Sequence, residues 1–449
     1  MMLHVFGLIT RTSGGDSMQI FERLESNIRG YCRTYPVIFD KARNAEQFDE
    51  EGNRYIDFFA GAGVLNFGHN NEAMKNAMVE YLENDGVTHS LDMYTMAKRQ
   101  FLENFEAIIL KPRKLEYKVQ FTGPTGTNSV EAALKLARKV TGRRSIVSFT
   151  DGFHGMTLGS LACTGNKLFR DAAGVSLNDV VRLPFDGYPG ANPDSLEILR
   201  FQLNDPSSGL APPAAFLVET IQAEGGVNLA RKEWLLALQD LARKHESLLI
   251  VDDIQVGCGR TGTYFSFEDI GLEPDLVCLA KGIGGFGTPL AVLLIKPEYD
   301  VWSPGEHTGT FRGQNLSFVA GTVALQYFKN KKFLDSITKK GKIMEDRLAG
   351  IVKLYWQSPC LRDDCYCPHN KKNNGVSHRG KGMIHGLCLG HGKTAAAIVQ
   401  ESFKNGLLIA SCGPEGKVLK LIPPLTIEDD TLREGLDILE NAVEKVVSG

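Results

Sequence analysis

Several features of common protein classes are missing from this 449-residue sequence. No apolar run is long enough for a transmembrane helix, and the first ten residues lack the basic region and cleavage site of a signal peptide. The formal charge of −3 gives no excess that would attract nucleic acid or an acidic membrane surface. The nine cysteines are odd in number and lack paired CxxC spacing, which argues against a disulfide framework. We therefore expect a cytoplasmic protein without nucleic-acid or membrane partners, long enough for two domains.

Two apolar stretches end in chemically distinctive side chains. LLIVDDIQVGCGRTG at 248–262 begins as a buried strand that ends at Asp252, and the strand at 276–280 leads directly to Lys281. Open α/β sheets bind ligands where such parallel strands end. A lysine amine can form a Schiff base with pyridoxal phosphate, and a carboxylate can keep the pyridine nitrogen protonated. Taken separately, the aspartate could bind a metal or cap a helix, and the lysine could lie on the surface; together they favour a pyridoxal phosphate site.

A third stretch, VQFTGPTGTNSVEAALKLARKVTG at 119–142, supplies a phosphate site. It reads as a strand, a loop of small residues, and a helix with apolar residues at helical spacing. Asn128 and Glu131 have the spacing of a capping box at the helix start. A helix that begins in such a loop presents free N–H groups to a phosphate, although a plain capped helix would have the same pattern. In FTDGFHGMT, Phe153 and His154 follow another strand and can lay an aromatic face on the pyridine ring.

From about Met18 onward the chain resembles the class III (ω-amino acid) aminotransferases of pyridoxal phosphate fold type I. Several motifs in one order are more specific than any single motif. The matching segments are, in order, GTNSVEAALKLAR, DGFHGMTLG, ETIQAEGG, VDDIQVGCGRTG, PDLVCLAKGIG, GTFRGQN and LIPPLTI. The resemblance implies ping-pong transfer of an amino group between amino acid and 2-oxo acid substrates by a homodimer or a dimer of dimers.

Within the class, four segments favour one branch. They resemble the enzymes that move an amino group between glutamate/2-oxoglutarate and aspartate 4-semialdehyde/L-2,4-diaminobutyrate. The segments are YIDFFAGAGVLNFGHNN, DGVTHSLDMYT, YKVQFTGPTGTNSVEAALKLARK and WSPGEHTGTFRGQN. Other readings remain open: another ω-aminotransferase acting on ornithine, 4-aminobutyrate or a related diamine, a racemase or aminomutase on the same scaffold, and a catalytically dead binding protein.

The resemblance also implies roles for individual residues. Lys281 carries the cofactor and, once displaced by substrate, moves the proton as general acid and base. Asp252 pairs with the pyridinium nitrogen. The other cofactor-binding positions implied are Thr125, Gly126 and Thr127 at the phosphate, Phe153, His154 and Ile254 at the ring, Gln255 near the ring hydroxyl, and Thr310 from the neighbouring subunit.

Substrate recognition is expected from four charged residues. Glu219 and Glu224 match carboxylates on the substrate side of the class and can receive an ammonium group. Lys420, in KLIPPLTI, stands where the class in general has a carboxylate-binding arginine, and it replaces a bidentate fork by a point charge. Arg312, in TFRGQN, is an alternative carboxylate anchor, although a salt bridge at the subunit interface is its more usual role.

The expected fold class is α/β, with a mostly parallel seven-stranded central sheet covered by helices and a smaller α+β domain built from both chain ends. An amphipathic helix is expected over Gln19–Arg33, and Leu290–Ile295 fits an antiparallel strand of the family. Parallel strands are expected at 146–149, 216–220, 248–252 and 276–280. The expected divisions are 1–17 as a loose N-terminal extension, 18–71 as a segment that packs with the small domain, 72–325 as the large cofactor-binding domain, and 326–449 as the small domain.

One polar segment, 357–381, departs from the family and carries or adjoins several potential metal ligands. Thiolates and imidazoles together suggest zinc, but their spacing fits no ordinary structural site. We expect no metal and interpret the segment as an exposed loop insertion. The residues concerned are Cys360, Cys365, Cys367, His369, His378, His385, Cys388 and His391.

Overall fold

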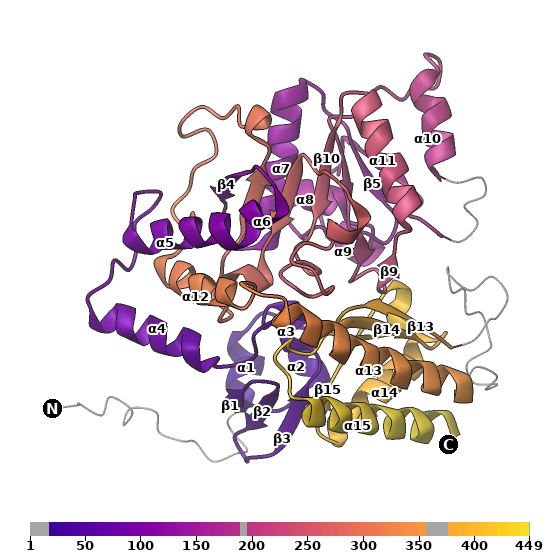
Figure 1. Ribbon diagram of the computed structural model, residues 1–449. Helices are drawn as coiled ribbons and strands as arrows, with labels where there is room; N and C mark the ends of the chain where they lie inside the picture. The colour runs from indigo at the N-terminus through magenta and orange to yellow at the C-terminus, as the bar shows by residue number, and fades with distance from the viewer. Residues whose placement is uncertain (1–17, 189–194, 356–375, 449) are drawn as a thin grey trace.

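A seven-stranded sheet forms the centre of the computed structural model, which describes residues 18–188, 195–355 and 376–448 (Figure 1). β12 is antiparallel to both of its neighbours, and the other adjacent strands are parallel. The predicted fold class and the antiparallel strand are therefore confirmed. In spatial order the strands are β4 (Lys118–Phe121), β12 (Val292–Ile295), β11 (Leu276–Leu279), β10 (Leu248–Asp252), β7 (Ala215–Val218), β5 (Ile146–Phe149) and β6 (Val180–Leu183).

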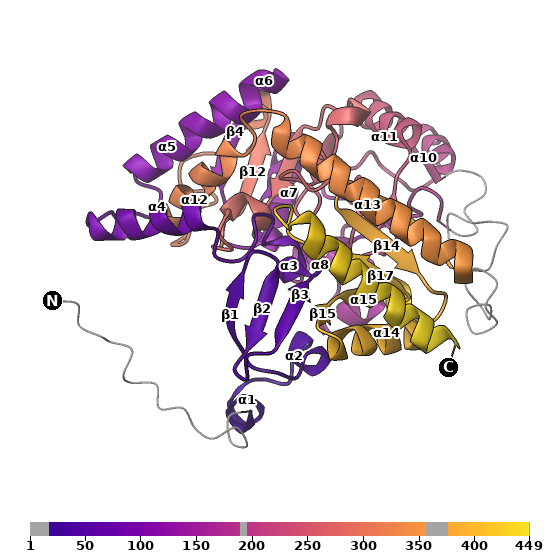
Figure 2. The same cartoon turned by 60° about the horizontal axis from the view of Figure 1, so that its bottom comes forward.

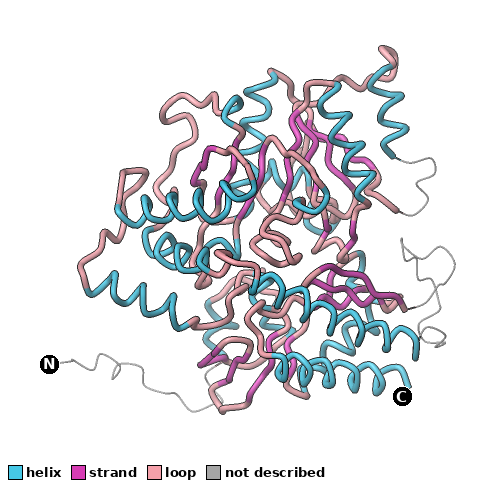
Figure 3. The backbone as a smooth tube through the Cα atoms, viewed as in Figure 1, coloured by secondary structure: helices cyan, strands magenta, loops and turns pink. Residues whose placement is uncertain are grey.

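Helices cover both faces of this sheet, so its inner strands are apolar along their whole length. Every residue of β5, β7, β10, β11 and β12 is buried. Successive residues point to opposite faces: Ile250 packs in the core with helix α7, whereas Val251 packs in the core on the other face. The covering helices, visible on either side in Figures 1 and 3, include α5 (Met96–Asn104), α7 (Gly126–Thr141), α11 (Lys232–Lys244) and α12 (Asn315–Gln326).

The N-terminal and C-terminal parts of the chain share a second hydrophobic core. β3 (Arg54–Asp57) pairs in parallel with β15 (Leu407–Leu408), which joins segments 350 residues apart in one sheet. Figure 2 shows these N-terminal strands beside the C-terminal helices. The predicted α+β part built from both chain ends is thus confirmed, whereas the exact domain limits stay predictions. Its other elements are β1 (Phe39–Arg43), β2 (Glu46–Asp49), β13 (Ser377–Lys381), β14 (Ile384–Cys388), β16 (Ala410–Cys412), β17 (Val418–Leu421), α13 (Lys332–Tyr355), α14 (Gly392–Lys404) and α15 (Asp429–Ser448).

The remaining elements are short or lie at the rim. The helices are α3 (Ala60–Gly63), α4 (Glu72–Glu83), α6 (Lys111–Arg113), α8 (Leu158–Cys163), α9 (Lys167–Asp171) and α10 (Ser195–Asn204). A two-stranded ribbon joins β8 (Ile221–Gln222) to β9 (Asn228–Leu229). Among the described residues, no helix has the length and apolar character needed to cross a bilayer.

The prediction of one helix over Gln19–Arg33 is wrong. The segment forms two short helices, α1 (Gln19–Leu24) and α2 (Tyr31–Thr34), with no helix between them. The apolar side chains that suggested an amphipathic face are exposed: Phe21 by 42% and Ile28 by 90%. Helical periodicity marks an apolar face, but a helix persists only where another element covers that face.

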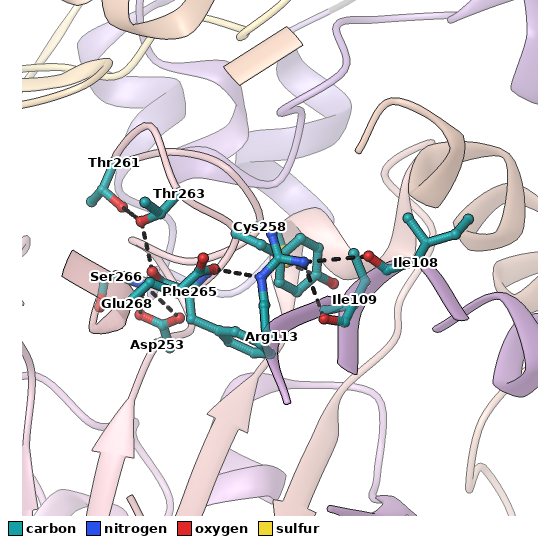
Figure 4. A network of polar contacts seen from close by, with 11 residues as sticks. Ile108, Ile109, Arg113, Asp253, Cys258, Thr261, Thr263, Phe265, Ser266 and Glu268 are labelled. Carbon is teal, nitrogen blue, oxygen red and sulfur yellow. Dashed lines mark hydrogen bonds and ion pairs between the residues drawn. The ribbon is translucent and has the colours of Figure 1, made fainter. Parts of the chain in front are cut away.

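A polar network fastens the loop that follows β10 (Figure 4). Arg113 Nε donates to Glu268 Oε1 over 2.8 Å, and its Nη1 donates to the carbonyl oxygens of Ile108 and Ile109 over 3.3 and 3.0 Å. Glu268 Oε1 also accepts the Phe265 N–H over 2.7 Å. Burial raises the pKa of Asp253, beside this network, to about 7. The loop that follows β10 is therefore tied through Arg113 to the helical segment that precedes β4.

We expect Arg113→Ala to lower the free energy of unfolding by about 2 kcal/mol, because it removes one of two donors to a part-buried carboxylate oxygen and the side-chain donor to two carbonyl groups. Urea unfolding at pH 7 measures the change. Arg113→Lys, which keeps the charge but loses the planar fork, should fall between the alanine variant and the wild type. A loss below about 0.5 kcal/mol in the alanine variant would show that the network contributes little.

Candidate active site

Five strands of the central sheet, β4, β5, β7, β10 and β11, lead at their carboxyl ends into one cavity of about 310 Å³. This is where parallel sheets bind ligands. A second cavity of about 770 Å³ shares Phe153, Glu224 and Lys281 with the first and extends from it. The predicted site residues that line the smaller cavity are Thr125, Gly126, Thr127, Phe153, His154, Glu219, Glu224, Asp252, Ile254, Gln255 and Lys281.

Lys281 stands at the point where both cavities meet. It follows β11 after one residue and has a φ of +54°, a left-handed conformation that is unfavourable for a residue with a Cβ. Burial lowers the pKa of its amine to about 8, against the opposing charges of Glu224 and Asp252. At physiological pH the neutral amine is thus a minority form, but a much larger one than for an ordinary lysine, and it is the form that a nucleophile or general base requires.

Asp252 ends β10 and is held by two donors. His154 Nδ1 lies 2.8 Å from Asp252 Oδ2, and the Ile254 N–H donates to Oδ1 over 3.2 Å. The side chains of Asp252 and His154 are only 5% and 2% exposed, so water cannot replace this contact. The sequence had placed His154 against the ring face with Phe153. Its contact with the aspartate was missed, because residues 98 positions apart give no local signal of proximity.

The N-terminus of α7 forms the end of the cavity that was predicted to bind a phosphate. Its helix cap differs from the predicted one. The Thr125 N–H donates to Asn128 Oδ1 over 3.3 Å, so the capping pair is Thr125 and Asn128. Glu131 instead accepts from Thr157 Oγ1 and the Ser160 N–H, over 2.6 and 3.0 Å. The amides of the first helical turn have no intrahelical partners and suit an anion.

These residues fit pyridoxal phosphate. A side chain at Gly126 would meet Ile254 Cδ1 at 3.0 Å, so only glycine allows the helix N-terminus to approach the cavity so closely. Ile254 and Phe153 give the cavity apolar walls. One space thus contains the three groups that the cofactor needs. The amine with a lowered pKa suits its aldehyde, the buried carboxylate suits its pyridine nitrogen, and the anion-binding helix end suits its phosphate.

Glu224 and Lys420 form an ion pair beside Lys281, in which the side chain of Lys420 is 1% exposed and that of Glu224 is 31% exposed. Lys420 Nζ donates to Glu224 Oε1, and Gln255 Nε2 donates to the same oxygen over 3.0 Å. Burial alone would raise the pKa of Glu224, but the charges of Lys420 and Lys281 lower it to about 2. The carboxylate anchor predicted at Lys420 therefore already has a protein partner.

Glu219 behaves in the opposite way. Its Oε2 accepts the Phe153 N–H over 3.1 Å. Burial, and then the charge of Asp252, raise its pKa well above the usual range, which favours the protonated form. Of the two carboxylates predicted to receive an ammonium group, one thus has a raised pKa and the other is already paired.

Thr310 and Arg312 lie outside both cavities of this chain. Arg312 Nη2 donates to the carbonyl oxygen of Thr308 over 2.8 Å in the same loop. The roles predicted for these two residues, at the neighbouring subunit's phosphate and at a subunit interface, need a second chain and stay predictions.

The predicted Cys/His segment lies partly outside the described residues, which include none of Cys360, Cys365, Cys367 and His369. Within the parts of the chain that the structure describes, no three His, Cys, Asp or Glu side chains are grouped so as to hold a metal ion. His385, nearby, lies 2.9 Å from the carbonyl oxygen of Gly382 through its Nε2. The interpretation of the segment as a loop insertion stays a prediction.

Comparison with known proteins gives one consistent family. The sequence profile described as Aminotransferase class-III matches residues 29–363. Diaminobutyrate–2-oxoglutarate transaminase of Bordetella parapertussis is 51% identical over 433 residues, 96% of each chain, and that of Halomonas elongata is 48% identical over 96% of this chain and 99% of its own. An uncharacterized aminotransferase of Sinorhizobium fredii is 52% identical over 97% of this chain and 94% of its own.

Solved structures agree with the fold. The ornithine aminotransferase of Toxoplasma gondii superimposes with a TM-score of 0.81 at 24% identity, covering 98% of this chain and 97% of its own. An aminotransferase of Bacillus anthracis gives a TM-score of 0.82 at 22% identity, covering 97% and 100%. At these identities the likeness establishes the fold alone.

The lowered pKa of Lys281 has a consequence for cofactor uptake. Only the neutral amine can attack an aldehyde, and the amine is protonated below its pKa and neutral above it. The rate at which cofactor-free enzyme attaches pyridoxal phosphate should therefore rise with pH through about 8 and then level off. Stopped-flow absorption measures this rate; Lys281→Ala should attach none, and Lys342→Ala, an exposed lysine, should match the wild type. A rate that keeps rising towards pH 10.5, the ordinary lysine value, would contradict the lowered pKa.

Proposed function

Because this chain belongs to the class III aminotransferases, we propose that it moves an amino group between glutamate/2-oxoglutarate and aspartate 4-semialdehyde/L-2,4-diaminobutyrate. The observation that carries this proposal is the similarity, at about half of all positions and over nearly full length, to relatives named for that reaction. The family's cofactor is pyridoxal 5′-phosphate. The free cysteines among the described residues further support the proposal of a cytoplasmic enzyme.

In this proposal each cavity residue has a defined task. Bound pyridoxal phosphate supplies an aldehyde that accepts the amino group and a ring that withdraws electrons. Asp252, oriented by His154, holds the ring nitrogen in its protonated form. Lys281 removes a proton from the substrate carbon and returns it during the transfer, for which an amine with a pKa of about 8 is suited.

Phosphate and ring are held by the cavity walls. The first-turn amides of α7, from Gly126 and Thr127, would bind the phosphate, and Phe153 and Ile254 would enclose the ring. The paired charges of Glu224 and Lys420 keep the substrate side of the cavity close to neutral. For Lys420 to bind a substrate carboxylate, it must exchange Glu224 for the substrate, which makes that binding weaker than at an unpaired lysine.

Substrate assays test the reaction itself. Purified enzyme with L-2,4-diaminobutyrate and 2-oxoglutarate should form glutamate, and omission of 2-oxoglutarate should stop turnover after one half-reaction. Ornithine and 4-aminobutyrate should react at least about tenfold more slowly, because a poorly matched substrate loses at least one charged contact. Rapid reaction of either without any reaction of diaminobutyrate would assign the chain to another branch. Turnover that needs no 2-oxo acid would indicate a racemase or aminomutase.

We also propose that the enzyme is a homodimer or a dimer of dimers in which Thr310 completes the phosphate site of the other subunit. Large apolar side chains are exposed close to the loop that carries it: Phe311 is 62% exposed, and its ring lies 5.4 Å from that of His89. Exposed apolar patches of this kind support a protein interface. The other exposed residues of the same region are Val87, Leu91, Met93, Tyr94 and Met96.

Complementation between two inactive variants tests this arrangement. Lys281→Ala and Thr310→Ala chains should each have little activity alone. In a mixed dimer, one of the two sites combines an intact Lys281 with an intact Thr310, so mixing after partial unfolding should restore activity. Mixing Lys281→Ala with Asp252→Asn is the matched control: both changes remove residues that one chain supplies to its own site, so the Lys281→Ala/Asp252→Asn pair should restore none. A fully active monomer in sedimentation would rule out the shared site.

A further inference from the structure

Among the described residues, one carboxylate of the larger cavity has no hydrogen-bond or ion-pair partner for its side chain. Three carboxylates of the described chain line this cavity: Asp151, Glu224 and Glu415. Glu224 is paired with Lys420, and Glu415 Oε2 lies 2.9 Å from Lys417 Nζ. Within the described residues, Asp151 accepts no side-chain hydrogen bond and forms no ion pair. It is therefore the carboxylate that remains for a ligand in the space that Lys281 also lines.

The backbone around Asp151 is rigidly placed. Asp151 follows β5 and has a φ of +61°, a conformation that favours glycine and, among other residues, asparagine and aspartate. Two glycines pack against it: a Cβ at Gly225 would meet the Asp151 carbonyl oxygen at 2.3 Å, and one at Gly165 would meet its nitrogen at 2.9 Å. The Gly165 N–H donates to the carbonyl oxygen of Gly152 over 2.7 Å. A turn clamped on two sides presents its carboxylate in a preset place.

The cationic side chains near Asp151 have other partners, so its carboxylate can bind a ligand. Burial raises its pKa to about 6, and the positive charge of Arg379 opposes that rise. The Arg379 guanidinium is already occupied by the carbonyl oxygens of Gly226 and Val227, with Nη2 to Gly226 O at 2.6 Å. Lys167, on the same cavity wall, lies 3.7 Å from Asp171. At pH 8 Asp151 is thus a partly desolvated anion without a bonded cation, and a ligand ammonium group would satisfy it.

We propose that Asp151 receives the second ammonium group of an α,ω-diamino acid whose other amine reacts at Lys281, and so acts as a specificity-determining residue. The inference rests on the proposed function and names the contact that selects a diamine. It replaces the sequence-based assignment of this task to Glu219 or Glu224, because Glu219 already accepts the Phe153 N–H and has a raised pKa, and Glu224 is paired with Lys420. A substrate without that ammonium group makes no contact with Asp151 and gains no affinity there.

A pair of substrates that differ only in the α-ammonium group tests whether Asp151 recognises that group or supports the activity in general. 4-Aminobutyrate has the carboxylate and the γ-amine of L-2,4-diaminobutyrate and lacks only the α-ammonium group. The experiment mixes holoenzyme with each amine, and with glutamate, and follows the change in cofactor absorption as a single half-reaction. Asp151→Asn keeps the shape and tolerates the positive φ, and Asp151→Gly relieves the backbone, so the two variants share only the loss of the carboxylate.

In both variants the second-order rate constant for diaminobutyrate should fall about ten- to hundredfold, as expected for loss of one charge-assisted contact. The rate constants for 4-aminobutyrate and glutamate should change less than about twofold, because neither uses the contact. Glu415→Gln removes the ion-paired carboxylate of the same cavity and should leave all three unchanged. If Asp151→Asn folds poorly, the rate constants of Asp151→Gly alone test the role of the carboxylate.

An equal loss for all three amines, or no loss for diaminobutyrate, would overturn the role of Asp151 while leaving the proposed reaction intact. A wild-type enzyme that reacts with glutamate but not with diaminobutyrate would refute the proposed substrate, and the inference with it. Failure of the proposed substrate shows in the wild-type enzyme, whereas failure of the role of Asp151 shows only in the variants, so the two can be distinguished.

Discussion

The parallel pairing of β10 with β11 is the constraint on which the site depends. Both strands are buried on both faces, and their register places Asp252 opposite Cys278, three residues before Lys281. An acid and an amine therefore emerge from neighbouring strands at the same edge of the sheet. Because a shift of one residue would turn every side chain of a strand to the other face, the apolar packing of the strands also fixes the chemistry at their ends.

The charges at this edge depend on one another. Lys281, Glu224, Lys420, Glu219 and Asp252 lie together in a space from which protein excludes most water. Burial pushes each group towards its neutral form, and only a close opposite charge or hydrogen bond counteracts it. Glu224 has such a partner and its pKa is lowered, whereas Glu219 faces another carboxylate and its pKa is raised. The pKa values of two glutamates in the same space are therefore shifted in opposite directions because their neighbours differ.

The second core brings its own residues to the site. β16 carries Cys412 to the rim of the larger cavity, and β17 carries Lys420 to Glu224 in its wall, although both strands belong to the sheet formed with β13 and β14. β3 is held by β15, and the turn after β3 supplies Ala62, whose carbonyl oxygen accepts from Gln255 Nε2 over 2.7 Å. The cavity is therefore a boundary between two packed regions, the usual place for ligand sites. Its shape depends on how these regions contact each other.

The sequence by itself determined the central sheet, the positions of Lys281 and Asp252, and the helix at the phosphate end. Buried parallel strands are apolar throughout, and a reactive residue after such a run is visible in the local order of residues. Local order also gave two wrong predictions. The apolar face over Gln19–Arg33 has helical spacing but lacks a covering element, so it does not form one helix. The cap of α7 is formed by Thr125 and Asn128 rather than by Asn128 and Glu131.

Only the tertiary structure decided which charges meet. The contact of His154 with Asp252 spans 98 positions and that of Lys420 with Glu224 spans 196, so nothing in either local sequence predicts them. The same holds for Asp151, which has no ion pair among the described residues, because Glu224 and Glu415, the other carboxylates of its cavity, are paired with lysines. Residue types fix what chemistry is available, but protonation and pairing depend on distance and burial, which arise only when the chain packs.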